Sequence, residues 1–447
     1  MNKQHLSVVI RHKIKPYKKK IKVDSDKSLS IRSFLIGSIC QGVSTAKNIL
    51  ESEDVKNTIA VCKKLGVRIK KVNPKVYKIF GRGLGSFSIK KNSELDFGNS
   101  GTASRLFIGS LSTTPSIRVR LKGDHSLNKR SMKKLIELMS EFGASFFPEN
   151  KYNFPLKMVS SELPIGIKYN SGVSAQLKSA VILAGLNSYG STRIIERVKS
   201  RNHTENLLKQ NTQTLKFKSK KNEITILGKK YLKPFNIDIG GDPSSAAFFV
   251  ALTLLLKNSS LKIKNVGLNP TRIGFYELLK RQKAKIKFLN IKKKNNEVSG
   301  DIFIKSCKLK PFNTPVSFYP KTTDEYLILF VMAALTNGVS SFKGIADLAN
   351  KESSRAYEMK KILNQIGVRC KLTTNEMKIF GKGMIDASNK KIFVGKLGDH
   401  RVAMCAFILA ILTNAKTSIK NFETVFTSSP SFLKIMKYLG AKFEIKK

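Results

Sequence analysis

Apolar stretches of about ten to fourteen residues recur along the chain, and a short polar turn precedes each of them. Six such stretches begin at or next to these residues: Lys27, Gly101, Ala175, Pro243, Asp324 and His400. Apolar side chains occupy nearly every side of the helix that each stretch would form, which is typical of a helix enclosed by protein. The starts recur about every 75 residues, so the sequence predicts a repeated structural unit.

A second, more amphipathic helix is expected between successive apolar helices, with a glycine at its end and a strand after it. The glycines in this place are Gly66, Gly143, Gly367 and Gly440. Glycine commonly ends a helix because it adopts a left-handed conformation without steric cost. Residues 78–83 (KIFGRG) recur as residues 378–383 (KIFGKG), which adds a strand and a turn to the repeat. We therefore expect an α/β fold of six βα units with the apolar helices inside.

The N-terminal ends of the apolar helices are the first candidates for binding chemistry. Ser, Thr, Asn, Asp or Gly stands at each start, where backbone N–H groups have no partner within the helix. These N–H groups and the helix dipole favour an anion. Three such ends from each domain, facing one cleft, would attract phosphates and carboxylates.

Length and composition limit the class of protein. The chain has 447 residues, of which 41% are hydrophobic, so we expect two domains. Its apolar runs are shorter than the roughly 20 residues that span a bilayer, and the N-terminus lacks the pattern of a secretory signal. The five cysteines are scattered and show no metal-ligand spacing. We expect a cytoplasmic protein with no bound metal.

The charge of the chain favours an anionic partner. Lys and Arg number 82 against 30 Asp and Glu, which gives a formal net charge of +52. Lysine dominates and is spread along the chain, whereas a nucleic-acid surface would interleave cations with aromatic residues. A compositional bias toward Lys, Asn and Ile, visible in residues 286–297, explains most of the excess, and a smaller part would steer acidic substrates. A basic nucleic-acid-binding repeat protein is the alternative from another class.

Charged and amide side chains interrupt three of the apolar helices. Lys27 and Arg32 stand in the first, Arg105 in the second, and Gln176 and Lys178 in the third. A cation on a buried helix needs an anion, which is either a bound ligand or a neighbouring carboxylate. Because the feature recurs in consecutive units, the pattern favours a ligand.

Two carboxylates lie in the segments with the most candidate anion-binding groups. Asp324 precedes the fifth apolar helix, and Glu352 precedes Arg355. Arg355 and Arg401 occupy matching places in the last two units and suit bidentate binding of a carboxylate or phosphate. The two carboxylates are candidates for general acid–base catalysis, and the alternative is that they only orient the arginines.

Ten motifs, taken in order, resemble the 5-enolpyruvylshikimate-3-phosphate synthases. They are DKSLSIR (26–32), DFGNSGTASR (96–105), GDHSLNKRSM (123–132), SAQLKSA (174–180), SRNHTE (200–205), GDPSSAAF (241–248), NPTR (269–272), TDE (323–325), KESSR (351–355) and GDHR (398–401). The resemblance implies transfer of the enolpyruvyl group of phosphoenolpyruvate to the 5-hydroxyl of shikimate 3-phosphate. It implies release of phosphate, no cofactor, and a monomeric enzyme with no nucleic-acid partner.

The resemblance also implies the architecture. Residues 1–25 and 242–447 would form one domain, and residues 26–241 the other. Each domain would consist of three repeated units arranged as an inside-out α/β barrel, with the active site in the cleft between the domains. The chain would cross between them near residues 24–26 and 240–242.

Roles at the site follow from the matching motifs. The expected contacts of shikimate 3-phosphate are Lys27, Ser28, Arg32, Ser174, Ala175, Gln176, Ser200, Arg201, Asp324 and Lys351. Those of phosphoenolpyruvate are Lys27, Asn99, Gly101, Arg130, Gln176, Arg355 and Arg401. Asp324 would take the hydroxyl proton, Glu352 would protonate the methylene carbon, and Lys27 would assist catalysis. Gly101 would leave room for the inhibitor glyphosate.

Four positions depart from the pattern of the family. Ser25 replaces a usual Gly, Ser131 a Pro and Ser354 an Asp, and Thr427 stands where some members have Lys. The nearest alternative is the sister family of UDP-N-acetylglucosamine enolpyruvyl transferases. That family typically has Asn at the place of Ser28 and a cysteine in an active-site loop, whereas no cysteine lies between Cys62 and Cys307 here.

Overall fold

The computed structural model describes residues 6–218 and 221–446, and the chain divides into two compact units. The first unit comprises Met1–Asp24, Gly240–Lys292 and Val298–Lys447, and the second comprises Ser25–Ile239 and Lys293–Glu297. Each unit has its own hydrophobic core. Residues 1–5 of the expected first segment lie outside the described residues.

The described residues form six four-stranded sheets, three in each unit. The orders in the first unit are β22 (Lys391–Val394), β23 (Lys416–Ile419), β1 (Ser7–Ile10), β24 (Glu444–Lys446); β16 (Ile286–Lys294), β17 (Glu297–Lys305), β15 (Ser260–Gly267), β2 (Lys18–Ile21); and β18 (Asn313–Thr314), β19 (Gly338–Lys343), β21 (Glu376–Gly381), β20 (Cys370–Leu372). Those in the second are β10 (Lys168–Ser171), β11 (Ser191–Glu196), β13 (Glu223–Leu227), β12 (Leu215–Lys218); β14 (Asn236–Asp238), β3 (Gln41–Lys47), β5 (Val76–Arg82), β4 (Arg68–Asn73); and β6 (Ser93–Asp96), β7 (Arg118–Lys122), β9 (Leu156–Val159), β8 (Ser145–Phe147).

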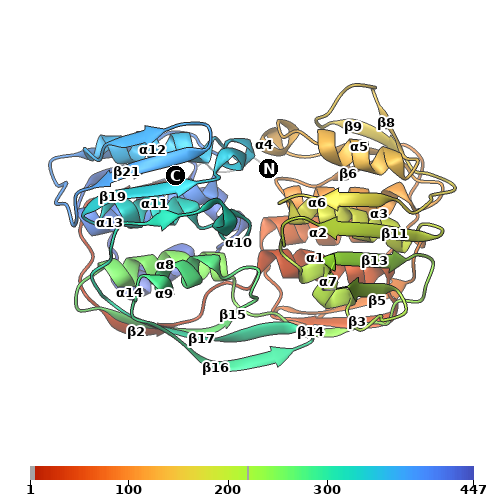
Figure 1. Cartoon of the computed structure of the whole chain (residues 1–447), viewed down its shortest axis with the longest axis horizontal. Coiled ribbons are helices and arrows are strands. Elements are labelled where there is room, and N and C mark those ends of the chain that lie inside the picture. Colours follow the sequence, from red (N-terminus) through yellow and green to blue (C-terminus); the bar gives the residue numbers. More distant parts are fainter. Residues whose placement is uncertain (1–5, 219–220, 447) are drawn as a thin grey trace. The chain divides into compact units, whose positions relative to one another are not determined.

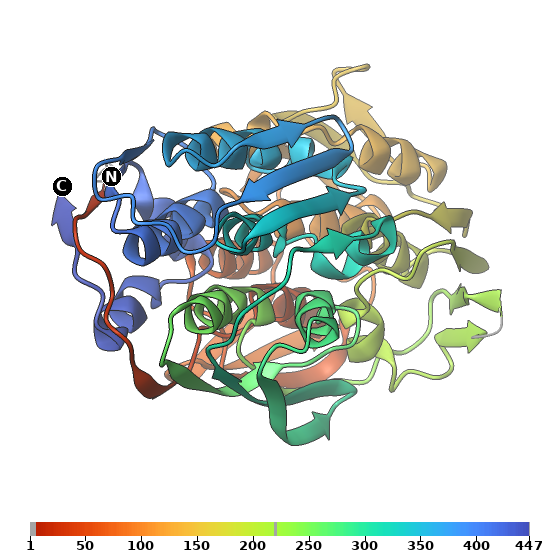
Figure 2. The same cartoon turned by 60° about the vertical axis from the view of Figure 1, so that its left-hand side comes forward.

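The six sheets share one pairing pattern. Each has a parallel pair at one edge, and antiparallel pairing continues from the inner strand of that pair. In four sheets an apolar helix joins the two parallel strands, as a crossover requires. In the other two, the edge strand, β2 or β14, comes from a distant part of the chain. The first and last described strands, β1 and β24, pair with each other in an antiparallel arrangement (Figure 2).

The six apolar helices are buried almost throughout, as the all-round apolar pattern predicts. They are α8 (Pro243–Leu255), α11 (Tyr326–Ala334) and α13 (His400–Thr413) in the first unit and α1 (Lys27–Ile39), α3 (Gly101–Ser112) and α6 (Ala175–Leu186) in the second (Figure 1). Five begin at the predicted residue. The fifth, α11, begins at Tyr326 and not at Asp324, because Asp324 and Glu325 form a turn that precedes it.

The amphipathic helices cover the sheets and the buried helices. They are α2 (Glu53–Lys64), α5 (Lys133–Glu141), α7 (His203–Leu208), α9 (Gly274–Arg281), α12 (Arg355–Gln365) and α14 (Phe432–Leu439). Short helices α4 (His125–Asn128), α10 (Tyr319–Thr322), η2 (Val316–Phe318), η3 (Ala346–Asn350) and η4 (Phe422–Thr427) complete the chain. The four predicted helix-ending glycines all have positive φ. The prediction of an α/β fold is confirmed.

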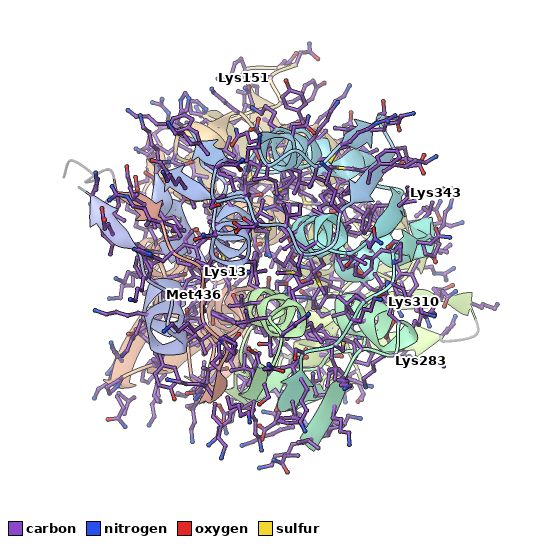
Figure 3. All side chains as sticks on the ribbon, turned by 90° about the vertical axis from the view of Figure 1, so that its left-hand side faces the viewer. Lys13, Lys151, Lys283, Lys310, Lys343 and Met436 are labelled. Atoms are coloured by element: carbon purple, nitrogen blue, oxygen red, sulfur yellow. The ribbon has the colours of Figure 1, made fainter. Side chains whose placement is uncertain are left out.

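The distribution of lysine agrees with a dispersed charge. Lys283, Lys310 and Lys343 are exposed at separate places on the first unit (Figure 3). Among residues 6–218 and 221–446, the helices are too short or too polar to cross a bilayer.

The repeated strand glycine has a steric role in both units. A Cβ at Gly81, on β5, would overlap the carbonyl oxygens of Gly37 and Cys40 at the end of α1. A Cβ at Gly381, on β21, would overlap those of Ala333 and Thr336 at the end of α11. The strand therefore lies directly against the last turn of a buried helix, which explains why glycine recurs in this motif.

Gly81→Ala is expected to destabilise the protein by about 1–3 kcal/mol, because the helix carbonyls cannot move away from the added methyl group. Urea-induced unfolding measures this change. Gly172→Ala is the matched control, since no heavy atom lies within 4 Å of its Cβ position. A Gly81→Ala protein as stable as the Gly172→Ala protein would show that the close approach does not constrain the fold.

Candidate active site

The N-terminal ends of α1, α3 and α6 meet in the second unit. Arg105 Nη1 donates to Gln176 Oε1 at 2.9 Å, and Gln176 Nε2 donates to Thr102 Oγ1 at 3.0 Å. These bonds join the first turns of α3 and α6. Arg32 on α1 donates to Ser179 Oγ on α6 at 3.3 Å and to Thr204 Oγ1 on α7 at 2.9 Å. Three helix dipoles thus place partial positive charge at one end of this unit.

Lys27 stands at the first position of α1 and has a carboxylate partner. Its Nζ lies 2.9 Å from Asp54 Oδ2, on the first turn of α2. Ser28 follows it, half-buried, and its carbonyl accepts a hydrogen bond from Arg32 Nη1 at 3.1 Å. The ion pair fixes the ammonium beside the helix end, and the sequence pattern did not predict Asp54.

Asn99, Gly101 and Arg130 form a second corner of the same unit. Arg130 Nη2 donates to Asn99 Oδ1 at 2.7 Å, and Asn99 Nδ2 donates to Asp124 Oδ2 at 2.8 Å. A Cβ at Gly101 would lie 2.8 Å from Arg105 Nη1 and 3.0 Å from Arg130 Nη1. Two guanidinium groups therefore converge on the start of α3, where an anion would find both charge and N–H donors.

The third predicted helix end lies beside a loop from β11 to α7. Ser174 caps α6 by accepting from Leu177 N at 3.4 Å, and Ala175 is the first helical residue. Ser200 is buried in the loop, and Arg201 follows it half-buried.

Lys178 does not have the role that the sequence pattern favoured. Its Nζ lies 2.7 Å from Glu196 Oε1 and 2.5 Å from Glu205 Oε1, so protein carboxylates serve as its counter-ions. The alternative reading of a buried helix cation, a neighbouring carboxylate, is the correct one at this position.

In the first unit, Arg355 is the centre of an ion network. Its Nε lies 2.9 Å from Asp399 Oδ2, its Nη2 2.6 Å from Glu352 Oε2, and its Nη1 3.8 Å from Asp324 Oδ1. Arg401 Nη2 lies 3.4 Å from the same Asp324 oxygen, and Arg401 Nη1 donates to the Asp324 carbonyl at 3.1 Å. Both expected catalytic carboxylates therefore lie against the two expected carboxylate-binding arginines.

Helix starts position this network. Arg355 is the first residue of α12, Asp399 is the N-cap of α13, and Asp324 lies in the turn before α11. Asp399 accepts from Arg401 N at 3.0 Å through its other oxygen. Lys351, which is also a predicted site residue of this unit, pairs with Asp347 of η3.

Burial and charge fix the protonation state of Arg355. Its side chain is 2% exposed, and burial alone would lower its pKa. Asp399, Glu352 and Asp324 more than offset that effect and raise the pKa of Arg355 above its ordinary value. Asp324 and Glu352 are each 17% exposed, so they remain accessible to a substrate, whereas Asp399 is fully buried.

Sequence reasoning missed Asp54, the partner of Lys27. It singled out Arg105 but not its contact with Gln176, and it did not predict the contact of Asp399 with Arg355. Acidic residues number only 30 in this chain, so an acid at a helix start was an available signal for Asp54 and Asp399. Across the described ranges, no group of three His, Cys, Asp or Glu side chains could hold a metal ion.

The structure shows the surroundings of the four residues that depart from the family motifs. Ser131 Oγ accepts from Lys133 N at 3.3 Å, and Thr427 Oγ1 donates to the Thr424 carbonyl at 2.7 Å. Ser354 is the N-cap of α12, and its side chain makes no cap hydrogen bond. Ser25 is buried.

Comparison with known proteins decides the family. The model of the family described as EPSP synthase (3-phosphoshikimate 1-carboxyvinyltransferase) matches residues 11–436. The chain belongs to this family. The 3-phosphoshikimate 1-carboxyvinyltransferase of Zymomonas mobilis is 36% identical over 446 residues, 99% of this chain and 98% of that protein. The protein of the same name from Bacillus subtilis is 34% identical over 97% of this chain and 99% of its own length.

Solved structures agree with the family match. The EPSP synthase of Acinetobacter baumannii superposes with a TM-score of 0.83 at 31% identity, covering 99% of this chain and 100% of that chain. An enolpyruvyl transferase from Streptomyces tendae has a TM-score of 0.77 at 11% identity over 99% and 98% of the two chains, which shows a shared fold. The predicted membership of the EPSP synthase family is confirmed, and the chain is a transferase.

Asp399→Asn is expected to destabilise the protein by about 1–3 kcal/mol, because it removes one charge beside buried Arg355 but keeps an N-cap side chain. Asp399→Ala removes both the charge and the N-cap side chain, and should lower the free energy of unfolding by about 1 kcal/mol more. Thermal and urea unfolding of the two variants separate the contributions. An Asp399→Asn protein as stable as wild type would show that the ion pair contributes nothing.

Proposed function

We propose that this EPSP synthase family member transfers the enolpyruvyl group of phosphoenolpyruvate to the 5-hydroxyl of shikimate 3-phosphate. The products are 5-enolpyruvylshikimate 3-phosphate and phosphate, within the shikimate pathway to chorismate and the aromatic amino acids. The observation that carries this function is the ion network in which Asp324 and Glu352 contact Arg355 and Arg401. The network supports the proposal, because two carboxylates suited to acid–base chemistry contact two arginines suited to binding a carboxylate.

We also propose that each unit is an inside-out α/β barrel of three repeats and that each supplies part of the active site. Support comes from each unit separately, because helix N-termini and charged side chains gather at one end of each. The second unit supplies the acceptor contacts Ser28, Arg32, Ser174, Ala175, Gln176, Ser200 and Arg201, and the first supplies Lys351. The donor phosphate is bound by Lys27 and Arg130, and the donor carboxylate by Arg355 and Arg401. The further donor contacts are Asn99, Gly101 and Gln176.

The electrostatics suit two multiply charged anions that repel each other in water. Fixed cations and helix ends offset that repulsion, and their geometry is set before the substrates bind. Holding both reactants in orientation can supply as much as about 7–11 kcal/mol of barrier reduction.

The proton transfers follow from the ion network. The acceptor hydroxyl oxygen attacks C2 of phosphoenolpyruvate as Asp324 takes its proton, and Glu352 donates a proton to C3. The tetrahedral adduct then loses phosphate from C2, and the proton held by Asp324 passes to the departing phosphate. Glu352 takes a proton back from the methyl group. A donor carboxylate competes with Glu352 and Asp324 for the N–H groups of Arg355 and Arg401. Donor binding therefore releases both carboxylates for proton transfer.

Phosphorus NMR of the purified protein with shikimate 3-phosphate and phosphoenolpyruvate tests this function directly. Inorganic phosphate and a new enol ether phosphate should appear together. Turnover only when UDP-N-acetylglucosamine replaces shikimate 3-phosphate would transfer the protein to the sister family, and no reaction with either acceptor would refute both assignments.

Glu352→Gln is expected to lower kcat by about 10²–10⁴-fold while leaving acceptor affinity nearly unchanged, because it removes a transferable proton but not a binding cation. Single-turnover kinetics and calorimetric binding of shikimate 3-phosphate measure the two effects. Normal turnover in this variant would remove Glu352 from the acid–base role.

Arg32→Ala is the complementary variant. Loss of a charge-assisted contact should weaken acceptor binding by about 10- to 100-fold and leave the KM for phosphoenolpyruvate nearly unchanged. An equal rise in the constants of both substrates would contradict the assignment of Arg32 to the acceptor.

Gly101→Ala tests the donor corner and the glyphosate hypothesis. The added Cβ would displace the guanidinium groups of Arg105 and Arg130, which lie 2.8 and 3.0 Å away. We expect the KM for phosphoenolpyruvate to rise about tenfold and inhibition by glyphosate to weaken, with acceptor affinity unchanged. Unaltered donor kinetics would show that this corner does not bind the donor.

The alternatives lack such support. Burial raises the pKa of the thiols of Cys40, Cys62 and Cys370 to about 12, so these cysteines do not resemble a reactive loop cysteine. Lysine is spread along the sequence, which gives no support for one nucleic-acid-binding stripe. A monomeric state and a cytoplasmic location stay predictions, and gel filtration measures the first.

A further inference from the structure

Lys178 is a fully buried cation that the proposed mechanism does not use. It lies on the second turn of α6, and its side chain is 0% exposed. Burial alone would lower its pKa, but Glu205 and Glu196 raise it above the ordinary value for lysine. Lys178 therefore stays charged between two carboxylates, one at the end of β11 and one on α7.

This cluster closes around the loop that connects β11 to α7, residues 197–202. Lys178 Nζ donates to the Ser200 carbonyl at 3.4 Å, and Ser200 N donates to Glu196 Oε1 at 3.5 Å. On α7, which follows the loop, Glu205 Oε1 lies 2.5 Å from the same Lys178 Nζ. The backbone of Ser200 is thus held from both sides by groups that meet at Lys178.

A second set of hydrogen bonds links the far side of the loop to the acceptor contacts. Thr204 Oγ1, one residue before Glu205, donates to Ser179 Oγ at 2.8 Å and accepts from Arg32 Nε at 2.9 Å. Lys178 and Ser179 are adjacent on α6, so the α7 start, the loop and Arg32 share one short stretch of that helix. A shift of the loop would therefore move Ser200 and Arg201 relative to Arg32 and Gln176.

We propose that Lys178 is a positioning residue for the acceptor: it fixes the loop 197–202 so that Ser200 and Arg201 are placed to bind shikimate 3-phosphate. The proposal rests on the proposed function. It assigns no contact between Lys178 and substrate, since the ammonium is enclosed by Glu196, Glu205 and the Ser200 carbonyl. The donor corner at Asn99 and Arg130 shares none of these bonds.

The test compares substrate constants in Lys178→Met. Calorimetry should show shikimate 3-phosphate binding weakened by about tenfold, and the KM for phosphoenolpyruvate, measured at saturating acceptor, should stay within about twofold of wild type. Lys178→Arg keeps the charge and should recover most of the acceptor affinity. Unchanged acceptor affinity in Lys178→Met would overturn the proposal.

A double variant separates positioning from stability. Lys178→Met leaves two buried carboxylates without their cation, whereas Lys178→Met with Glu205→Gln removes one of those charges. Melting temperature should therefore rise back toward wild type in the double variant, while acceptor binding stays weak because the Ser200 carbonyl still lacks its donor. Acceptor affinity that recovers together with the melting temperature would show that Lys178 has only a structural role. The double variant carries the test if Lys178→Met cannot be purified.

Lys262→Met is the control in the other unit, where Lys262 is 26% exposed and, among the described residues, pairs with Asp301 alone at 3.0 Å. It should leave both substrate constants unchanged, and a similar loss of acceptor affinity in this control would also count against the proposal. Turnover by the wild-type protein distinguishes failure of the proposed function from failure of the positioning role. An inactive wild-type protein refutes the proposed function, whereas an active wild type with an unaffected Lys178→Met refutes only the positioning role.

Discussion

The structure depends on burying helices that are apolar on every side. Such a helix has no face to turn toward water, so sheets and amphipathic helices must surround it, and only its two ends can reach polar groups. Packing three of them in one unit brings three N-terminal ends together. The attraction for anions that is expected at these helix ends therefore follows in part from the core.

Charges at these ends are compensated within the protein. Arg355 is surrounded by carboxylates, and Lys178 lies between two. Arg272 repeats the arrangement at the start of α8, where Nη2 contacts Ser244 Oγ at 2.9 Å and Asp242 Oδ1 at 3.4 Å. A buried charge without a partner would be costly, whereas a paired one holds helix starts from different repeats in a fixed relation. The same ion pairs thus fix the positions of the residues that are proposed to act at the site.

The sequence predicted the repeats and the buried helices because periodicity and apolarity are local properties. It placed five helix starts correctly and began α11 two residues early, because Asp324 and Glu325 belong to the turn before that helix. Ion partners were harder to predict. Lys27 and Asp54 are 27 residues apart and Arg355 and Asp399 are 44 apart, so only folding brings them together. For Lys178 the local pattern suggested a ligand, because neither glutamate lies on its own helix.

Ser354 departs from the related motif at a place that adjoins the ion network. The related motif has Asp at this place, which at the N-cap of α12 would improve the interaction with the helix dipole. Here the network already sets three carboxylates, Asp324, Glu352 and Asp399, against two arginines. A fourth carboxylate beside Glu352 would add repulsion and compete for Arg355. Serine has no charge to interact with the helix dipole, and its side chain makes no hydrogen bond to the helix. It also does not compete with Glu352 and Asp324 for Arg355.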